Sequence, residues 1–491
     1  MELSDQTLSE LHLEKGSYIY FIGIGGSSMS GLAELSLSRG YRVAGSDIGP
    51  STATEKLEKL GIKVNIGHDA ANITDDIALV VYTVAISRET NPEYLRALEL
   101  EKPVVERGLY LGCIAKHYNK TVAVSGVHGK TTTTSMLTTI LRETGRNPSA
   151  HVGGVIPGIE SNVLAGGKEI FVTEACEYHD NFLHVHPFSG AILNIEPEHL
   201  DYFKKFRNVK KSFNAFARNI DENGYLIVCA DSCTALARAR HTRAKIITYS
   251  TKRKKAPFFI RNARGEKVFS HLYAGDLRKI KGGEGIEAIR RGYTYTLYRD
   301  GNEIADVTLS VPGLYNVSDS LASIALAGSV GCDDRESAAA VSSFKGAKRR
   351  FEFVGMTGSG AYVISDYAHH PSEVKVTVNA ARENAPQKVI AVFQPHTYSR
   401  AKRFKRKFAR GLKSADSVIV TDIYAAREKD TGVINSRMLD AIFRRRNVNS
   451  VYISAFADIA EKIKADAGNE DVVLLLGAGT VNKIADLIVK K

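Results

Sequence analysis

The stretch VAVSGVHGKTTTTSML, residues 122–137, joins an apolar run to a turn with two glycines and then to a threonine-rich segment. The apolar run predicts a buried strand that ends near Ser125, and the segment from Thr131 onward predicts a helix. Between them, Gly126 and Gly129 let backbone N–H groups approach an anion, and the helix N-terminus adds partial positive charge there. The stretch therefore predicts a phosphate site within an α/β fold.

The loop itself reads G-V-H-G-K-T, which is shorter between its glycines than the usual G-x-x-x-x-G-K-[ST] loop. We expect Lys130 to reach the β- and γ-phosphates of ATP and the Thr131 hydroxyl to ligate Mg²⁺, with Mn²⁺ as a possible substitute. The plainer alternative is a strand–turn–helix with a solvated lysine, and the register of all the parts argues against it. The predicted ATP-binding residues are Gly126, Val127, His128, Gly129, Lys130, Thr131 and Thr132.

A second glycine-rich turn, YFIGIGGSSMSG, lies earlier in the chain, at residues 20–31. Gly23, Gly25 and Gly26 follow a predicted strand, Ser28 stands where the dinucleotide fingerprint has its third glycine, and Asp47 ends the next strand. Taken alone, this pattern fits NAD or another diphosphate ligand. An NAD-dependent dehydrogenase would, however, leave the central phosphate loop without a use.

Composition and length set the broad class of the protein. A chain of 491 residues is expected to form about three domains. Its five cysteines form no CxxC pair, which favours a reducing compartment. The acidic, polar N-terminus is unlike an export signal, and no run of about 18 apolar residues predicts a membrane span. We therefore expect a cytoplasmic protein without stable membrane insertion.

The net charge is +12, and basic residues gather at residues 252–255, 348–350, 402–407 and 444–446. Such runs are compatible with nucleic-acid binding, with a solvated surface, or with attraction of small anionic substrates. Because these runs lie far apart and lack interleaved aromatic repeats, we expect no nucleic-acid partner.

Apolar runs of strand length alternate with helical segments in three blocks, which predicts mostly parallel sheets covered by helices. We place the domain boundaries at residues 1–118, 119–330 and 331–491. Residues 251–306 are basic, glycine-rich and irregular, and we expect them to form short antiparallel strands at the edge of the central domain. In the last block, polar residues follow the strand ends, where open α/β sheets bind ligands.

Several motifs in order give the chain a resemblance that spans residues 17–489: GIGGSSMSG, GVHGKTTTT, EACEYHDNFL, NIEPEHLDYF, GLYNVSDSLASIALA, RRFEFVG, DYAHHPSEV, VFQPHTYSR, DIYAAREKD and GAGTV. Together with the short G-x-x-G-K-T-T loop, they resemble the Mur ligases and their folylpolyglutamate synthase relatives. The resemblance implies an N-terminal Rossmann-like domain for a UDP-sugar, a central P-loop ATPase-type domain, and a C-terminal Rossmann-like domain for an amino acid.

Within the family, the chain most resembles members that join L-alanine to the lactyl carboxylate of UDP-N-acetylmuramate through an acyl phosphate, with release of ADP and phosphate. The likeness assigns the first glycine turn to the UDP-sugar, with the site residues Gly23, Gly25, Gly26, Ser27, Asp47 and Thr83. Two alternatives stay open: a murein peptide ligase that adds a recycled tripeptide to the same UDP-sugar, and a non-catalytic nucleotide-dependent scaffold.

The central motifs supply further expected site residues. In the family, the residues matching Glu174 and His199 hold a magnesium ion, so the implied metal ligands are Thr131, Glu174 and His199. Without the phosphate loop nearby, Glu174 would be taken as a surface acid and His199 as a capping or core histidine. The family usually writes EADESDGSFL where this chain has EACEYHDNFL, and we expect Cys176 to be a passive substitution because no base partners it.

In the last block, the resemblance implies an amino-acid site formed by Tyr367, His369, His396 and Arg400, with the arginine suited to a carboxylate. The plainer alternative is that the histidines satisfy each other or cap helices. Thr397 stands where the family usually has arginine, so either one cationic contact is missing or Lys402 or Arg403 supplies it. The expected catalytic residues are Lys130, Glu174, His199, His369 and Arg400.

The sequence does not decide between a monomer and a homodimer. It leaves open the selectivity among alanine, serine and glycine, the feedback control and the role of the basic segment 252–292.

Overall fold

The computed structural model describes residues 2–3, 13–156, 158–257, 259–281, 286–289, 291–385, 387–426 and 428–490. Most of the N-terminal segment that is unlike an export signal, and the glycine-rich stretch 282–285 of the expected edge strands, lie outside the described residues. The chain divides into two compact units, one of Met1–Gly275, Thr296–Ala305 and Ser318–Val341, and one of Asp276–Tyr295, Asp306–Val317 and Ser342–Lys491.

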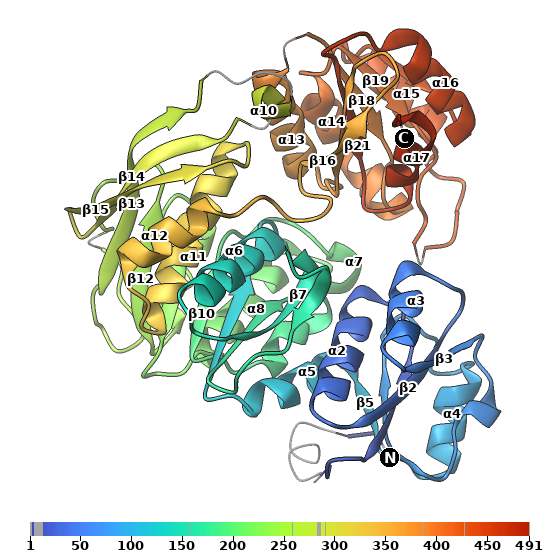
Figure 1. Ribbon diagram of the computed structural model, residues 1–491, viewed down its shortest axis with the longest axis vertical. Coiled ribbons are helices and arrows are strands. Elements are labelled where there is room, and N and C mark those ends of the chain that lie inside the picture. The colour runs from blue at the N-terminus through green and yellow to red at the C-terminus, as the bar shows by residue number, and fades with distance from the viewer. Residues whose placement is uncertain are drawn as a thin grey trace. The chain divides into compact units, whose positions relative to one another are not determined.

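The first sheet is five-stranded and parallel, in the order β3-β2-β1-β4-β5. Alternate residues of β1 face opposite sides, so Ile19 and Phe21 pack with α2, α3 and α5, while Tyr20 and Ile22 pack with α4. Figure 1 shows α2, α3 and α5 on one side of the blue strands and α4 on the other. The elements are β1 (Tyr18–Ile22), α2 (Ser27–Ser38), β2 (Arg42–Asp47), α3 (Thr52–Lys59), β3 (Lys63–Ile66), η1 (Ala70–Asn72), β4 (Ile77–Tyr82), α4 (Pro92–Glu99), β5 (Val104–Glu106) and α5 (Arg107–Lys116).

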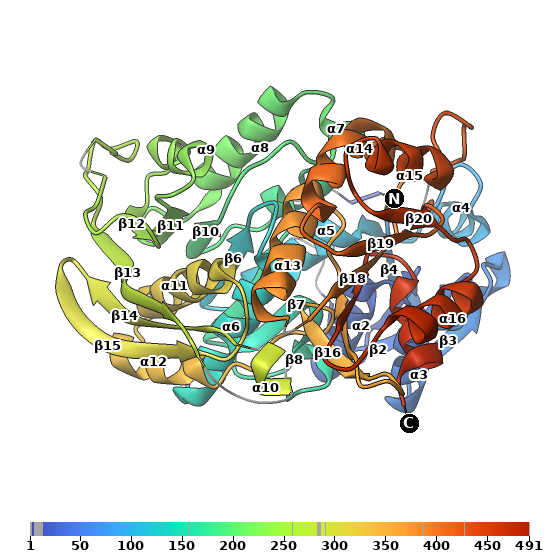
Figure 2. The ribbon, with the colours of Figure 1, turned by 90° about the horizontal axis from the view of Figure 1, so that it is seen from above.

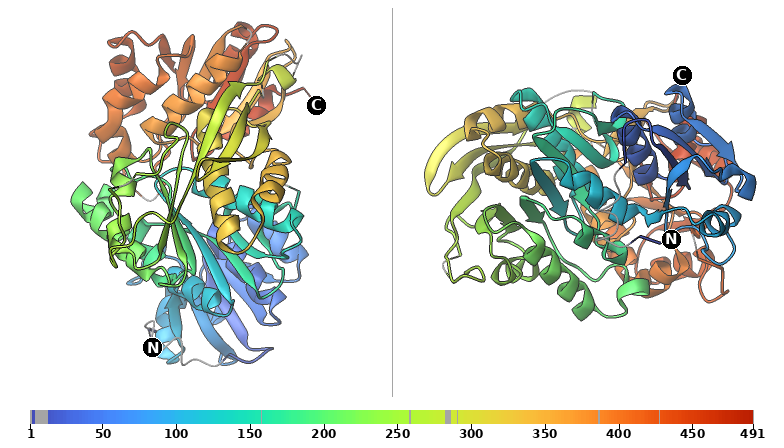
Figure 3. Two further views of the ribbon diagram at one scale, coloured as in Figure 1. Left: turned by 90° about the vertical axis from the view of Figure 1, so that its left-hand side faces the viewer. Right: turned by 90° about the horizontal axis from the view of Figure 1, so that it is seen from below.

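The second sheet is ten-stranded, in the order β15-β14-β13-β12-β11-β10-β6-β9-β7-β8, and Figure 3 shows its green and yellow strands side by side. Its centre is parallel, and β8 pairs antiparallel with β7 at one edge. The elements up to β12 are β6 (Lys120–Ser125), α6 (Lys130–Glu143), β7 (Ser149–Ile156), β8 (Ser161–Leu164), β9 (Ile170–Ala175), η2 (Tyr178–His184), β10 (Ser189–Ile192), α7 (Leu200–Phe203), α8 (Phe206–Asn219), β11 (Tyr225–Cys229), α9 (Cys233–Leu236), η3 (Ala239–His241) and β12 (Lys245–Ser250).

Residues 251–306, which we expected to form short antiparallel strands, lie at the other edge of this sheet. The expectation is corrected in part, because the first of these strands is parallel to its neighbour. β13 (Ser270–Lys279) is ten residues long and pairs with β12 in parallel. The chain reverses after it: the Ile280 N–H donates to the Gly292 carbonyl and the Asp300 N–H to the His271 carbonyl, as in antiparallel strands. Asp300 and Gly301, both at positive φ, then form a two-residue turn between the next two strands. The elements are α10 (Ile286–Ile289), β14 (Tyr293–Arg299), β15 (Asn302–Leu309), α11 (Leu314–Ser329) and α12 (Asp334–Ser342).

The third sheet is six-stranded, in the order β16-β17-β21-β18-β19-β20, and only the β16–β17 pair is antiparallel. One face packs against α13, α14 and α15, and the other against α16 and α17. Figure 2 shows α14 and α15 on one side of these strands and α16 on the other. The elements are β16 (Glu352–Met356), β17 (Tyr362–Asp366), α13 (Pro371–Asn384), β18 (Val389–Phe393), α14 (Tyr398–Leu412), β19 (Ser417–Val420), α15 (Ser436–Arg444), β20 (Ser450–Tyr452), α16 (Phe456–Asp466), β21 (Val472–Leu476), η4 (Val481–Ile484) and α17 (Ala485–Ile488).

The predicted fold class is confirmed: three mostly parallel sheets carry helices, and each predicted ligand-binding turn follows a strand. The domain boundaries at 118/119 and 330/331 stay a prediction. Among the described residues, no helix has both the length and the apolar character needed to cross a membrane.

Candidate functional site

The central phosphate loop connects β6 to α6 and is held open by its glycines and by Asn194. Gly126 and Gly129 have φ values of 142° and 86°, and a Cβ on Gly129 would stand 2.7 Å from an Asp319 oxygen. Asn194 accepts from the His128 N–H and donates to the His128 carbonyl, both at 2.9 Å. Gly129 caps α6 without a side-chain hydrogen bond, so the first N–H groups of the helix are left for an anion.

Lys130 is turned back onto its own loop. Its Nζ donates to the Gly126 carbonyl at 2.6 Å and to Glu177 Oε2 at 3.0 Å. Burial is the largest single influence and lowers the pKa of the Lys130 amine, but the charge and hydrogen bond of Glu177, together with Cys176 and Glu174, raise the pKa overall. The lysine is therefore fully charged, and Glu177, only 1 % exposed, is its counter-ion. The sequence marks Glu177 only as one more acid, because its pairing with a residue 47 positions away has no sequence signal.

Glu177 also approaches His199. Its Oε1 accepts no hydrogen bond from any residue in the described ranges and lies 3.8 Å from His199 Nε2. His199 has a left-handed backbone, with φ 51°, at the residue before α7, and its ring lies 4.5 Å from the ring of Tyr178. The structure thus groups Lys130, Glu177 and His199, which come from three separate motifs.

Glu174 lies at the end of β9, beside the phosphate loop. Its Oε1 accepts the Gly153 N–H at 2.7 Å, and the next residue, Gly154, lies against the Thr131 methyl group. Glu174 and Thr131 therefore flank the same glycine pair. A carboxylate, a hydroxyl, one imidazole and the buried, unsatisfied Glu177 oxygen form an oxygen-rich donor set of the kind that suits Mg²⁺, so these residues fit the expected metal.

The segment that departs from the family motif has its own explanation. His179 and Asp180 have φ values of 54° and 57°, and Asp180 stands where the family has glycine. The Asp180 carboxylate accepts from Tyr202 Oη at 2.6 Å and from Ser212, which anchors this strained turn to α8. Desolvation raises the pKa of the Cys176 thiol, so the thiol is not activated as a nucleophile.

The first glycine turn is braced by Asp47 and Thr83, two of the predicted UDP-sugar residues. Asp47 Oδ2 accepts the Gly25 N–H at 2.8 Å, and a Cβ on Gly23 would stand 2.6 Å from the Thr83 methyl carbon. Gly26 caps α2 without a side-chain hydrogen bond, and Ser27 begins the helix. The turn therefore presents uncapped helix N–H groups at the carboxyl end of β1, as a diphosphate site requires.

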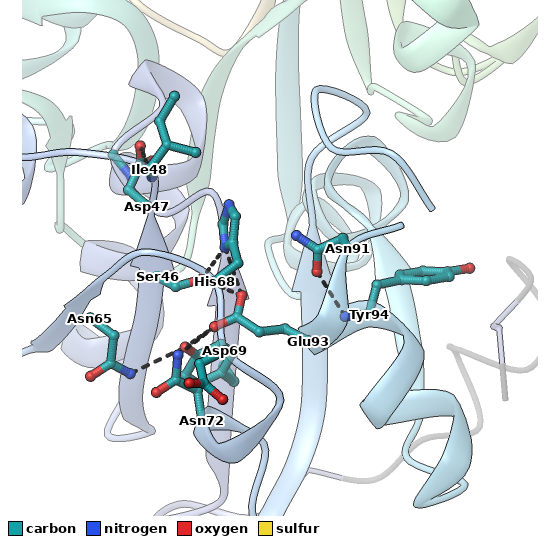
Figure 4. Close-up of polar contacts among 12 residues, drawn as sticks. Ser46, Asp47, Ile48, Asn65, His68, Asp69, Asn72, Asn91, Glu93 and Tyr94 are labelled. Carbon is teal, nitrogen blue, oxygen red and sulfur yellow. Dashed lines mark hydrogen bonds and ion pairs between the residues drawn. The ribbon is translucent and has the colours of Figure 1, made fainter. Parts of the chain in front are cut away.

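Beneath this turn lies a buried carboxylate that the sequence analysis missed. Glu93 is fully buried and accepts from Tyr20 Oη, Ser46 Oγ, His68 Nδ1 and Asn72 Nδ2 at 2.5–2.8 Å. Figure 4 shows Glu93 between Ser46, His68 and Asn72, below Asp47. The Ser46 carbonyl in turn accepts the N–H groups of Gly23 and Ile24, so this network sets the position of the turn. Its only sequence signal is an acid in the first turn of a helix.

The predicted amino-acid residues come together at the carboxyl ends of β17 and β18. The His369 and His396 rings lie 5.6 Å apart, and Arg400 Nη1 lies 2.8 Å from His396 Nδ1. His369 Nδ1 contacts the Tyr367 carbonyl at 3.0 Å and Glu373 at 3.2 Å. The histidines do not simply satisfy each other, because each has its own polar partner.

Further residues complete this cluster without having been predicted. Tyr424 stacks on His396 with ring centres 5.7 Å apart, and the Arg349 and Arg350 guanidinium groups lie 4.9 and 5.2 Å from the centre of the Tyr367 ring. Arginine 349 also donates to the carbonyls of Gly477 and Gly479, which ties the turn after β21 to the cluster. The family pattern RRFEFVG contained these arginines, but only the fold shows that they reach Tyr367.

Thr397, at the position where the family has arginine, precedes α14 with a φ of 62°, which is unfavourable for a β-branched residue. Lys402 and Arg403 are exposed, and the Arg403 guanidinium lies 5.6 Å from the ring centre of Phe404. Arg349 and Arg350 thus add cationic contacts to Tyr367, beside the contact of Arg400 with His396.

Family models match the chain in three consecutive segments. They describe the Mur ligase family catalytic domain over residues 18–119, the Mur ligase middle domain over residues 124–327, and the Mur ligase glutamate ligase domain over residues 349–479.

Individual proteins resemble the chain over nearly its whole length. The UDP-N-acetylmuramate–L-alanine ligase of Acetivibrio thermocellus is 41 % identical, covering 99 % of this chain and 98 % of the relative. The crystal structure of UDP-N-acetylmuramate-alanine ligase from Thermotoga maritima has 26 % identity and a TM-score of 0.77, covering 96 % of this chain and 97 % of that one. A murein peptide ligase from Psychrobacter arcticus, at 23 % identity and a TM-score of 0.69 over 96 % of this chain and 98 % of that one, shares the fold.

Proposed function

Because the chain belongs to the Mur ligase family, we propose that it joins UDP-N-acetylmuramate to L-alanine in an ATP-dependent amide ligation of peptidoglycan precursor synthesis. The observation that carries the proposal is the 41 % identity to UDP-N-acetylmuramate–L-alanine ligase over almost the entire chain. The protein is an enzyme, a ligase of the family whose members use ATP. The resemblance stated from the sequence motifs is confirmed.

ATP fits the central loop. The N–H groups of the loop and of the start of α6 face the phosphates, and Lys130 exchanges the Gly126 carbonyl for the β- and γ-phosphate oxygens. Because Glu177 keeps the lysine charged and close to the loop before the nucleotide arrives, the cation has only a short distance to move. The contribution of Lys130 is electrostatic: it offsets the charge that accumulates as a carboxylate approaches a triphosphate.

Thr131, Glu174 and His199 are the residues that would hold Mg²⁺, or Mn²⁺ in its place. An ion held there would supply positive charge that offsets the repulsion between the phosphates and the approaching carboxylate. Two like unit charges 4 Å apart repel by about 4 kcal/mol at an effective dielectric of 20. The Gly153 N–H bond to Glu174 fixes one of these ligands in advance, which lowers the cost of assembling the site.

The reaction follows from these placements. A lactyl carboxylate oxygen attacks the γ-phosphorus, the bond to the β-phosphate oxygen breaks, and ADP leaves an acyl phosphate. The alanine amine then attacks the acyl carbon, loses a proton, and phosphate departs with the carboxylate oxygen. Because water would hydrolyse the acyl phosphate, the substrates must be enclosed before the first step.

The cluster on the C-terminal unit suits the amino acid. Arg400 would pair with the alanine carboxylate, and His369 and His396, whose rings lie 5.6 Å apart, would contact the bound amino acid. Tyr367 holds two arginines against its ring and so adds positive charge at the same edge of the sheet. On the N-terminal domain, Gly23, Gly25, Gly26, Ser27, Asp47 and Thr83 form the proposed UDP-sugar site.

The test supplies purified protein with ATP, Mg²⁺ and UDP-N-acetylmuramate, and then adds L-alanine or the recycled tripeptide. We expect L-alanine, and not the tripeptide, to trigger phosphate release and to give a product heavier than the UDP-sugar by one alanyl group. Release with the tripeptide alone would favour the murein peptide ligase, and binding of both nucleotides without turnover would favour the scaffold.

Two further features belong to the proposal. We expect a monomer or a homodimer, which light scattering during size-exclusion chromatography distinguishes. We also expect NAD to leave the melting temperature unchanged, because the first turn is assigned to the UDP-sugar.

A further inference from the structure

The two glycine loops meet at one short segment of the chain. Gly153 and Gly154 lie in β7, a strand next to β9 in the second sheet. The Ser27 hydroxyl, at the start of α2 and beside the first glycine turn, donates to the Gly153 carbonyl at 3.0 Å. The N–H of the same Gly153 donates to Glu174 Oε1 at 2.7 Å. One residue thus connects the first loop to the expected metal ligand.

The space around this glycine pair is filled. A Cβ on Gly153 would stand 2.7 Å from Glu174 Oε2, and one on Gly154 would stand 3.1 Å from the Thr131 methyl carbon. Gly153 does not have a positive φ, so the need for glycine is set by the approach of the carboxylate and not by the backbone angle. The glycine allows Glu174 to lie directly against the backbone of β7.

The first loop is also attached to β7 and β8 by other bonds. Asn162 donates to the Ser27 carbonyl at 2.5 Å, and His151 contacts the Ser28 carbonyl at 3.1 Å. Lys56 reaches from the first domain to Ser161 at 2.6 Å. These bonds attach the first domain to β8 and to β7, the strand that holds Gly153.

We propose that Gly153 is a positioning residue that holds the Glu174 carboxylate for the metal ion, and that Ser27 couples it to the UDP end of the sugar nucleotide. A diphosphate bound at the first turn fixes Ser27, Ser27 fixes the Gly153 peptide, and Glu174 is then already ordered when the metal–nucleotide complex arrives. Coupling of this kind is reciprocal, so the metal–nucleotide complex also tightens the binding of UDP. This inference rests on the proposed function of the two loops.

The experiment measures the Kd of the Mn²⁺ complex of a non-hydrolysable ATP analogue by electron paramagnetic resonance, with and without saturating UDP. UDP is the probe because it lacks the lactyl carboxylate and so cannot contact the metal through that group. For the unmodified protein, we expect UDP to tighten metal–nucleotide binding by about five-fold or more. Calorimetry confirms the saturation by UDP in each variant.

Two variants separate the steps. Ser27→Ala should bring the ratio of the two Kd values to about one, whereas Ser27→Thr keeps the hydroxyl and should keep the ratio. Gly153→Ala should weaken metal–nucleotide binding even without UDP, because its methyl group displaces the carboxylate. Ser38→Ala, at the far end of the same helix, is the matched control and should behave as the unmodified protein.

An unchanged ratio in Ser27→Ala, or unmodified metal–nucleotide binding by Gly153→Ala with a native circular dichroism spectrum, overturns the inference and leaves the proposed function in place. A protein that binds neither UDP nor the metal–nucleotide complex overturns the proposed function itself.

Discussion

Acidification should weaken the attachment between the first glycine turn and β7 through one histidine. His151 is 3 % exposed, and its Nε2 contacts Ser28 at both the carbonyl and the hydroxyl. The pKa of His151 is lowered to about 4 from an ordinary value of 6.5. Burial is the main cause and the charge of Arg107 adds to it, while the hydrogen bond to the Ser28 carbonyl acts in the opposite direction. The perturbation is a change from about pH 7 to about pH 4, compared between the unmodified protein and His151→Gln.

The sign and size follow from the two pKa values. Above the ordinary pKa of 6.5, His151 is neutral in both the folded and the unfolded chain, so folding carries no protonation cost there. As the pH falls from 6.5 towards 4, the unfolded chain binds a proton that the folded chain does not, and stability is lost. At about pH 4 the loss from this one group is about 3 kcal/mol.

The assay is urea unfolding followed by far-ultraviolet circular dichroism, since the chain has no tryptophan to report by fluorescence. Glutamine keeps an N–H donor near the Ser28 carbonyl but does not titrate. Between the two pH values, the unmodified protein should therefore lose about 3 kcal/mol more unfolding free energy than His151→Gln. His117→Gln, at an exposed position, is the control and should track the unmodified protein. A gap between the unmodified protein and His151→Gln that does not change with pH would refute the reasoning.

Three further outcomes are expected. Lys130→Ala should lower the rate of ADP release by about 10²–10³-fold while UDP still binds; release at a near-normal rate would contradict the role of the lysine. Glu93→Gln should lower the unfolding free energy by about 3 kcal/mol, because the amide N–H group would face hydrogen-bond donors where the carboxylate accepts from them. Glu99→Gln, at an exposed position on the same helix, is the control and should cost under about 0.5 kcal/mol. Equal losses in the two variants would argue against the network. Burial raises the pKa of Asp366 to about 6 from 3.8, so protonation of this carboxyl favours the folded state. As the pH rises from about 3.5 to 7.5, the unmodified protein should therefore lose about 3 kcal/mol more unfolding free energy than Asp366→Asn. Urea-unfolding free energies that change in parallel for the two proteins would contradict this.

Much of the fold could be predicted because buried parallel strands are continuous apolar runs. The strands predicted before the two glycine turns are β1 and β6, and the strand predicted to end at Asp47 is β2, since apolar runs bounded by glycine or polar residues have few other solutions. The pair β7–β8 was missed, because Gly153 and Gly154 break the apolar run of β7 and resemble a loop. Those same glycines lie against Glu174 and Thr131. The rule that glycines mark a loop therefore fails at a strand where the site requires side chains to approach the backbone closely.

The sequence predicted individual residues of the candidate site but not the contacts between them. The phosphate-loop motif gave Lys130, and the resemblance to the Mur ligases gave Glu174, His199, His369 and Arg400. The ion pair between Lys130 and Glu177 and the burial of Glu93 among four donors depend on residues far apart in the chain. No local pattern encodes them, and only the folded arrangement brings them together.

The most direct test of the central claim follows one oxygen atom. UDP-N-acetylmuramate labelled with oxygen-18 in its lactyl carboxylate is incubated with the protein, ATP, Mg²⁺ and L-alanine, and the products are weighed by mass spectrometry. An acyl phosphate requires each amide formed to be accompanied by one ADP and one phosphate that carries a single oxygen-18 atom. Unlabelled phosphate, or ADP released without formation of the alanyl amide, would contradict the account.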